Sequence, residues 1–395
     1  MMMLSFSACS SSDTEEQKVN PLLEIHVFTP DYPVVTRADK GPVASEAQEM
    51  KLTDLRIWVF ESSDGKPVGY LNPAKTDYTQ TGGTFLMKVS DDFANRKPNV
   101  DVYVMANVNT GNCNITSVPD GSATRDALDN IMIEHSQDHD PFGLSSPKTS
   151  LGENDYLPMS GVLKGQQLTV NAPVLSVGNV QVVRAVSKVR FIFSSSTSTN
   201  QELKIKKITF DGSEAVNNTV IPKSISKSEY LFLNGPYTAT AQSNHINSDA
   251  GYYEEAETLF DKTGTGDTPI MVPSSTNPAQ FAWNGAQSGQ EYENLINREL
   301  AKVETETVKR EIIEGCRFYL RESDKQISGK IYYTVGESTD LKNQSFSLKE
   351  AGDFTRNHTW VVYGYFAGSN NLRIFTVAFT PWKELDEETH GLYNW

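Results

Sequence analysis

Disulfides cannot form the framework of this chain, because its 395 residues contain only three cysteines, Cys9, Cys113 and Cys316. A chain of this length can bury a large core without disulfides or metals, and the length suits two domains better than one. Cys113 and Cys316 stand in no CxxC motif and near no His/Cys cluster, which favours plain thiols over metal ligands.

Positive charge is also scarce. The chain has 35 Lys and Arg against 50 Asp and Glu, a formal net charge of −15. Such an excess of acid repels phosphate backbones and anionic lipid headgroups, which argues against a nucleic-acid partner and against electrostatic docking on membranes. No stretch has the roughly 18 consecutive apolar residues that a membrane-spanning helix needs, so any membrane attachment is expected to be through lipid.

Catalytic motifs are missing as well. The sequence has no GxSxG, HExxH or GxxxxGK[ST], and no GxGxxG between a strand and a helix. One polar cluster stands out, at Glu134, His135, Asp138, His139 and Asp140. We interpret it as a solvated turn rather than a metal site. The loop 261–267 lacks the alternating oxygen ligands of a calcium loop and is also interpreted as a turn. We therefore expect no enzymatic activity, no metal and no cofactor.

The chain does contain many segments with the residue pattern of a β-strand. Apolar residues alternate at Leu23, Ile25 and Val27, which predicts a first strand that ends before Pro30. The run 101–108 is almost continuously apolar and is predicted to be a central strand. Segments 359–366 and 372–379 are predicted to form a hairpin. Further strands are predicted at 52–60, 84–89, 167–170, 180–193, 202–210, 268–273, 317–320 and 330–335.

A single helix and one polar run interrupt this pattern. Ser122 or Thr124 can cap a helix that extends to about Glu134. The polar run 194–200 is the expected domain boundary. The resulting division is a leader with a removable first strand (1–37), an N-terminal domain (38–196) and a C-terminal domain (197–395). Residues 290–314 are dense in charge, which fits either a helix or a long hairpin.

The first residues resemble the lipobox of a bacterial lipoprotein. Small and apolar residues precede Cys9, and a polar run, 10–16, follows it. Two features differ from that motif. Phe6 stands where Leu is usual, and both the basic start and the apolar core of a signal peptide are missing. The resemblance implies lipidation of Cys9; an incidental cysteine in a disordered start is the alternative.

Seven short phrases, in one order, resemble the fimbrillin family of Bacteroidales, the subunits of type V pili. They are TRA at 36–38, VMAN at 104–107, LPMSG at 157–161, VRAVSKV at 183–189, FYLRE at 318–322, RNHTW at 356–360 and TVAFTPW at 376–382. Each phrase is weak alone, and together they span nearly the whole chain. The resemblance implies a mostly β fold with two transthyretin-like antiparallel β-sandwich domains and one or two short helices.

The resemblance also implies a route to the cell surface. The chain would be exported through the periplasm to the outer membrane as a lipoprotein, and an Arg-specific surface protease would cut the bond Arg37–Ala38. Loss of the first strand would open a groove for a C-terminal segment of a neighbouring subunit, by β-strand addition that propagates head to tail. The expected donor residues are Leu372, Ile374, Val377, Phe379, Trp382, Leu385, Leu392 and Trp395.

The alternation of apolar residues is interrupted at Phe375, which suggests that part of this segment completes its own C-terminal domain. We therefore expect the exchangeable donor segment to begin beyond about Pro381. Two further hypotheses stay open. The protein could be a non-polymerising anchor or a tip adhesin that binds a host protein or glycan, with aromatic residues such as Trp283 in a sugar platform. A surface hydrolase is the third, although no nucleophile and base can be named.

Overall fold

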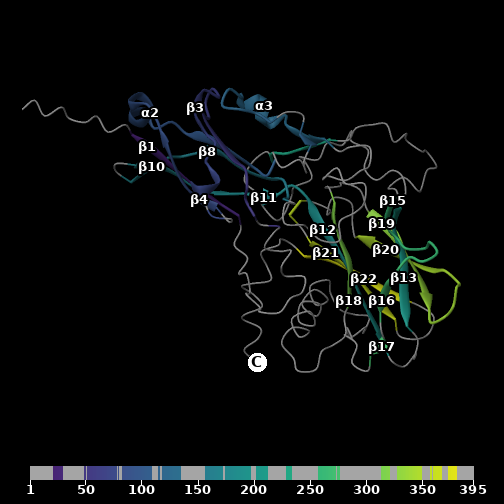
Figure 1. The fold of residues 1–395 in the computed structure, drawn as a ribbon. Helices are drawn as coiled ribbons and strands as arrows, with labels where there is room; N and C mark the ends of the chain where they lie inside the picture. Colours follow the sequence, from purple (N-terminus) through teal and green to yellow (C-terminus); the bar gives the residue numbers. More distant parts are fainter. Residues whose placement is uncertain are drawn as a thin grey trace, which may run out of the picture.

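We describe the protein from a computed structural model. The structure describes residues 21–29, 49, 51–77, 79, 82–108, 114–115, 118–134, 156–171, 174–196, 202–211, 228–233, 257–272, 274–275, 313–320, 327–348, 356–357, 359–366 and 372–379. Within them the chain is mostly β and forms two sandwiches, as predicted (Figure 1).

The N-terminal sandwich consists of two sheets that face each other across one core. Sheet I has the order β4 (Gly82–Lys88), β1 (Leu22–Phe28), β10 (Val174–Gln181), β9 (Thr169–Asn171). Sheet II has the order β11 (Val183–Arg184), β8 (Met159–Gln166), β5 (Val100–Ala106), β2 (Leu55–Glu61), β3 (Pro67–Leu71). Strand β5 is central, as its continuous apolar run predicted, and it is buried on both faces.

A second, smaller core covers the outer face of sheet II. Trp58, Tyr103 and Met105 from sheet II pack there against Leu128 and Phe232. The covering elements are α3 (Arg125–Asp129) and a small sheet of β6 (Asn114–Ile115), β7 (Met132–Glu134) and β14 (Ser228–Tyr230). Short helices α2 (Asp91–Arg96) and η1 (Lys75–Asp77) complete this half. The residues around Phe232 thus pack on the N-terminal sandwich although they come later in the chain.

The C-terminal sandwich has the same two-sheet form. In sheet III, β12 (Ser187–Ser196) lies beside β21 (Thr359–Phe366), β22 (Leu372–Phe379) follows at one edge, and β17 (Ser274–Ser275) and β18 (Ile313–Leu320) pair with β12. In sheet IV the order is β15 (Glu257–Asp261), β13 (Leu203–Asp211), β19 (Ile327–Val335), β20 (Lys342–Leu348), and β16 (Ile270–Val272) also pairs with β13. The predicted hairpin is confirmed, because β21 and β22 pair antiparallel over eight residues.

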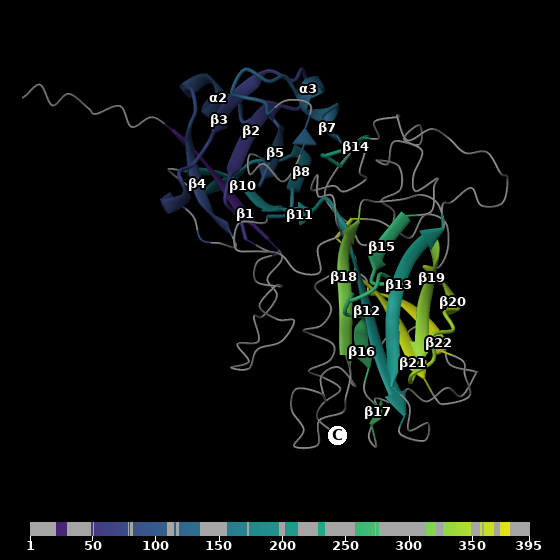
Figure 2. The same ribbon diagram turned by 45° about the vertical axis from the view of Figure 1, so that its right-hand side comes forward.

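Two expectations need correction. The run 180–193 is not one strand: it divides among β10, β11 and β12, and β12 places Val189, Phe191 and Phe193 in the C-terminal core (Figure 2). The change from one core to the other therefore lies between Val186 and Val189, upstream of the polar run. The helix capped by Thr124 ends at Asp129, and Met132–Glu134 is a strand. Parallel pairs such as β1–β10 and β12–β21 stand among the antiparallel pairs of the two sandwiches.

Candidate functional site

The first strand lies inside sheet I and not at its edge. Strand β1 pairs antiparallel with β4 from Leu22 to Phe28 and parallel with β10 along its other side. The pairing with β10 is irregular between Glu24 and His26. Both backbone edges of β1 are therefore used, so its removal would leave two facing strands with unpaired N–H and C=O groups.

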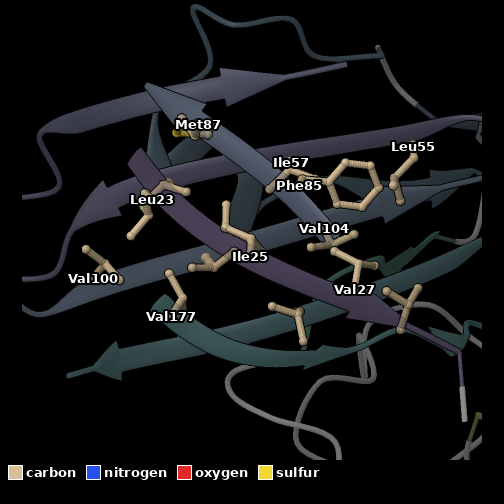
Figure 3. Close-up of a cluster of buried hydrophobic side chains, with 14 of the residues drawn as sticks. Leu23, Ile25, Val27, Leu55, Ile57, Phe85, Met87, Val100, Val104 and Val177 are labelled. Atoms are coloured by element: carbon tan, nitrogen blue, oxygen red, sulfur yellow. The ribbon is translucent and has the colours of Figure 1, made fainter. Parts of the chain in front are cut away.

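The inward face of β1 is a regular row of aliphatic side chains. Leu23, Ile25 and Val27 are each 0% exposed. Figure 3 shows these three side chains in one cluster with residues of sheet II, among them Ile57 and Val104. Each such buried aliphatic side chain contributes about 1.5–3 kcal/mol to the stability of the folded state. The strand therefore supplies three of the fully buried side chains of the N-terminal core.

The two ends of β1 are held by further backbone hydrogen bonds. Val89 N donates to Pro21 O at 3.0 Å, and Val182 N donates to Phe28 O at 2.8 Å. Next to the second end, β4 contributes Gly82 at φ 140°, and a Cβ there would lie 2.1 Å from Val27 O. Only glycine allows this approach, so the groove is fitted closely to the backbone of its strand.

The outward face of β1 is half-buried and mixed, with Leu22 and Phe28 at its ends and Glu24 and His26 between them. His26 Nδ1 lies 3.1 Å from Thr84 Oγ1 on β4, and the His26 and Phe28 rings stack with centroids 5.9 Å apart. Glu24 lies on the same face. The alternation read from the sequence thus identifies the buried face of β1 correctly, whereas the other face carries both apolar and polar side chains.

Downstream of β1, the chain is anchored at Glu49 by two buried cations. Lys188 Nζ lies 2.9 Å from Glu49 Oε2, and both side chains are 1% exposed. Arg184 Nε donates to Glu49 O at 3.0 Å. A little further on, Thr53 N donates to Asn107 Oδ1, and Asn107 Nδ2 donates to Lys51 O. The segment that follows the expected cut is therefore fixed to sheet II and β12 from Glu49 onward.

The same cations join the two sandwiches. Arg184 Nη1 donates to Asn357 Oδ1 at 2.9 Å, and Asn357 N donates to Val186 O at 2.8 Å. The neighbouring Arg356, 0% exposed, donates to Leu231 O and Tyr230 O, both at 2.6 Å. The phrases at 183–189 and 356–360 therefore meet at the domain junction, where their polar residues have structural roles.

Replacing Glu49 with Gln should destabilise the protein strongly. The change leaves the buried Lys188 ammonium without its counter-charge, which typically costs about 3–5 kcal/mol. Denaturant unfolding should show this loss, whereas Lys207→Ala at the half-exposed pair with Asp261 should cost no more than about 1 kcal/mol. Equal small effects at both pairs would contradict the anchoring role of Glu49.

The densest ionisable cluster in the described part of the chain lies on the other face of sheet II. Burial alone would raise the pKa of Asp101, but hydrogen bonds from Ser62, Gly165 N and Arg125 hold that pKa below its usual value. Burial and the neighbouring Asp129 raise the pKa of Tyr103, whose hydroxyl donates to Asp129 Oδ1 at 2.8 Å. Each carboxylate is thus engaged in fixing α3 and β8 to β5.

Most of the predicted site residues fall outside the described part of the chain. These are Cys9, Arg37, Ala38, Trp382, Leu385, Leu392 and Trp395, and also His135, Asp138, His139 and Asp140. Leu372, Ile374, Val377 and Phe379 lie in β22, where Leu372 is 1% exposed in the C-terminal core and Ile374 packs against that core. The start of the predicted donor segment therefore serves its own domain.

Within the described residues no group of three or more His, Cys, Asp and Glu could hold a metal ion, and no helix has the length and apolar character to cross a membrane. The loop 261–267 is a turn, as predicted: Asp261 Oδ1 accepts hydrogen bonds from Thr263, and Lys207 Nζ donates to Asp261 Oδ2.

Sequence reasoning missed Glu49 and underused the two cations. Arg184 and Lys188 interrupt an otherwise apolar run, and a buried cation requires a partner of opposite charge or a set of acceptors. That interruption was the available signal. The partner could not be found from the sequence, because Glu49 lies 139 residues before Lys188.

Comparison with known proteins finds similarity to solved structures. No family profile and no curated protein matches the chain. A candidate cell adhesion protein from Parabacteroides distasonis has 12% identity and a TM-score of 0.46, covering 92% of this chain and 98% of that one. A fimbrial assembly protein from the same species has 11% identity and a TM-score of 0.42, covering 90% and 94%. The tip fimbrial protein Mfa3 from Porphyromonas gingivalis has 11% and 0.41, covering 92% and 99%.

These neighbours are fimbrial and cell-adhesion proteins of Bacteroidales, in agreement with the fimbrillin resemblance of the sequence. Their identities and TM-scores are too low to carry an argument about function.

Proposed function

We propose that this protein is a structural subunit of a cell-surface fimbria that is matured by proteolysis and polymerises by strand exchange. The observation that carries the proposal is β1. It is the first described strand, it lies inside sheet I, and it places three fully buried aliphatic side chains in the core. It is also separable along the chain, because the candidate cut Arg37–Ala38 lies between β1, which ends at Phe28, and Glu49, which Lys188 and Arg184 hold on the other side of the cut.

Removal of β1 would create an acceptor for another strand. The empty place offers unpaired backbone groups on β4 and β10 and apolar pockets at alternate positions, which is the chemistry of β-strand addition. The contact joins unlike surfaces of two subunits and does not close, so it extends into a filament. Before assembly the chain would travel as a lipoprotein acylated at Cys9. Adhesion to a host protein or glycan is the proposed task of the filament.

A gel of whole cells tests the maturation step. Cells grown without an inhibitor of Arg-specific proteases should show the protein as a band smaller by the residues up to Arg37, and inhibited cells should show the full chain. An unchanged band in both samples would contradict maturation at this site. It would favour the alternative of an anchor subunit, which the complete pairing of β1 on both edges also fits.

Cutting the chain at Arg37 should not by itself release β1. The strand is held by two ladders and three buried side chains, each worth about 1.5–3 kcal/mol, so it should stay bound until another strand displaces it. Protein nicked with trypsin should elute from a gel-filtration column as one species that contains both fragments, and the fragments should separate only in denaturant. Immediate loss of the small fragment in native buffer would show that the hold is weak.

A further inference from the structure

The groove around β1 imposes a definite pattern on whatever fills it. Its three inward positions are occupied by Leu23, Ile25 and Val27, all fully buried and all aliphatic. In Figure 3 these side chains lie among residues of β2, β4, β5 and β10, which leave no solvent-exposed space beside them. A strand that replaces β1 must therefore present three medium-sized aliphatic side chains at alternate positions.

Larger or charged side chains do not suit these positions. An aromatic ring in place of Leu23 or Ile25 would overpack a core that is already filled, and a buried carboxylate would lack a counter-charge. Gly82 lies so close to β1 that a Cβ there would be 2.1 Å from Val27 O and 2.8 Å from Phe28 Cα, so a strand that fits this groove follows the same backbone path beside β4. Pattern and spacing are thus both restricted.

Residues 380–395 of this chain do not offer that pattern. Their apolar side chains are Pro381, Trp382, Leu385, Leu392, Tyr393 and Trp395, and no three of these fall at alternate positions. The register that starts at Leu385 would place Glu387 and Thr389 in the other two pockets, and the register that ends at Trp395 would place Tyr393 and Trp395 there. Each register puts a charge, a polar group or a large ring where β1 has an aliphatic side chain.

The strand just before this segment is also engaged. Strand β22 pairs with β21 along all eight of its residues, and Leu372 is buried in the C-terminal core. Withdrawal of β22 to fill a neighbour's groove would therefore open its own sandwich.

We infer that the groove around β1 accepts a strand from a subunit of different sequence, one with three aliphatic side chains at alternate positions, and not residues 380–395 of a second copy. This inference rests on the proposed strand exchange and deepens it. Residues 380–395, with their tryptophans, then fit a different subunit whose pockets are wider. The filament is accordingly built from at least two kinds of subunit, and this one stands between unlike neighbours.

Peptide exchange into the full-length protein, nicked at Arg37, tests the inference. Three fluorescent peptides serve as probes: residues 20–29, residues 380–395, and residues 380–395 with Glu387→Ile and Thr389→Val. The last peptide aligns Leu385 and the two new side chains with Leu23, Ile25 and Val27. We expect the first peptide to enter the groove, the second to bind at least about tenfold more weakly, and the third to recover most of the difference. Fluorescence anisotropy and co-elution measure the binding.

The outcomes separate the inference from the function on which it rests. If residues 380–395 enter as tightly as residues 20–29, the inference is overturned while strand exchange stands. The inference would also be overturned, and strand exchange would still stand, if the nicked protein alone formed filaments in light scattering and electron microscopy. If no peptide enters even at high concentration, the groove does not open, and the proposed exchange falls together with the inference.

Discussion

Cells that carry Arg37→Ala are expected to make a folded protein that does not join a filament. Arg37 stands between Pro33 and Pro42, where the sequence predicts an extended and accessible backbone that a trypsin-like enzyme reaches before the folded domains. Without the cut, β1 stays covalently attached and keeps its place between β4 and β10. The thermal unfolding midpoint should be unchanged, and electron microscopy should show no filament that contains the protein.

Two matched variants sharpen this experiment. Lys40→Ala removes a second basic residue from the same segment and should leave maturation and assembly intact. Arg37→Lys should block an Arg-specific protease in cells but still allow cleavage by trypsin in the test tube, so added trypsin should restore exchange competence. Normal assembly of Arg37→Ala would show that cleavage at this bond is unnecessary.

The fold was predictable where one side of a strand meets a core and the other meets solvent. Strand β1 is an example, since the alternation of Leu23, Ile25 and Val27 determined both its extent and its buried face. The hairpin β21–β22 was predictable for a different reason, because its loop has a usual length and composition. Such features depend on neighbouring residues only, which a sequence displays directly.

The domain boundary was not predictable, because composition alone does not show which core a strand joins. Apolar residues occur along the whole of 180–193, so nothing local marks the passage from Val186 in the first core to Val189 in the second. The polar run after Phe193 predicts a boundary that is instead the end of β12. Pairing of β12 with β21, about 170 residues later, decides its membership.

The candidate site was predictable in part, for the same physical reason. The sequence indicated a separable first strand, but its internal position in sheet I depends on the distant partners β4 and β10. Glu49 could not be assigned a role without Lys188 and Arg184 beside it. The role of this residue depends on its position: it lies twelve residues after Arg37, so its contacts with Lys188 and Arg184 hold the part of the chain that cleavage would retain.

Deletion of residues 384–395 should leave a folded subunit that is still cleaved but cannot add to the next one. The deletion spares β22, whose Leu372 completes the C-terminal core, and removes Leu385, Leu392 and Trp395. A chain terminus that stays in solvent would be expected to carry fewer large apolar side chains than these. In a neighbour's groove each could contribute about 1.5–3 kcal/mol, so their loss should abolish assembly rather than weaken it.

Leu372→Asp is the contrasting variant, because it places a charge in the core of the C-terminal sandwich and should unfold that domain. The truncated protein should unfold in denaturant like the full chain and should give no filament in cells that supply the other subunits. If filaments still incorporate the truncated protein, residues 384–395 take no part in strand exchange. If the truncated protein instead unfolds, these residues complete their own domain. A terminal position in the fimbria, as anchor or tip, would then explain why β1 is paired on both edges better than polymerisation does.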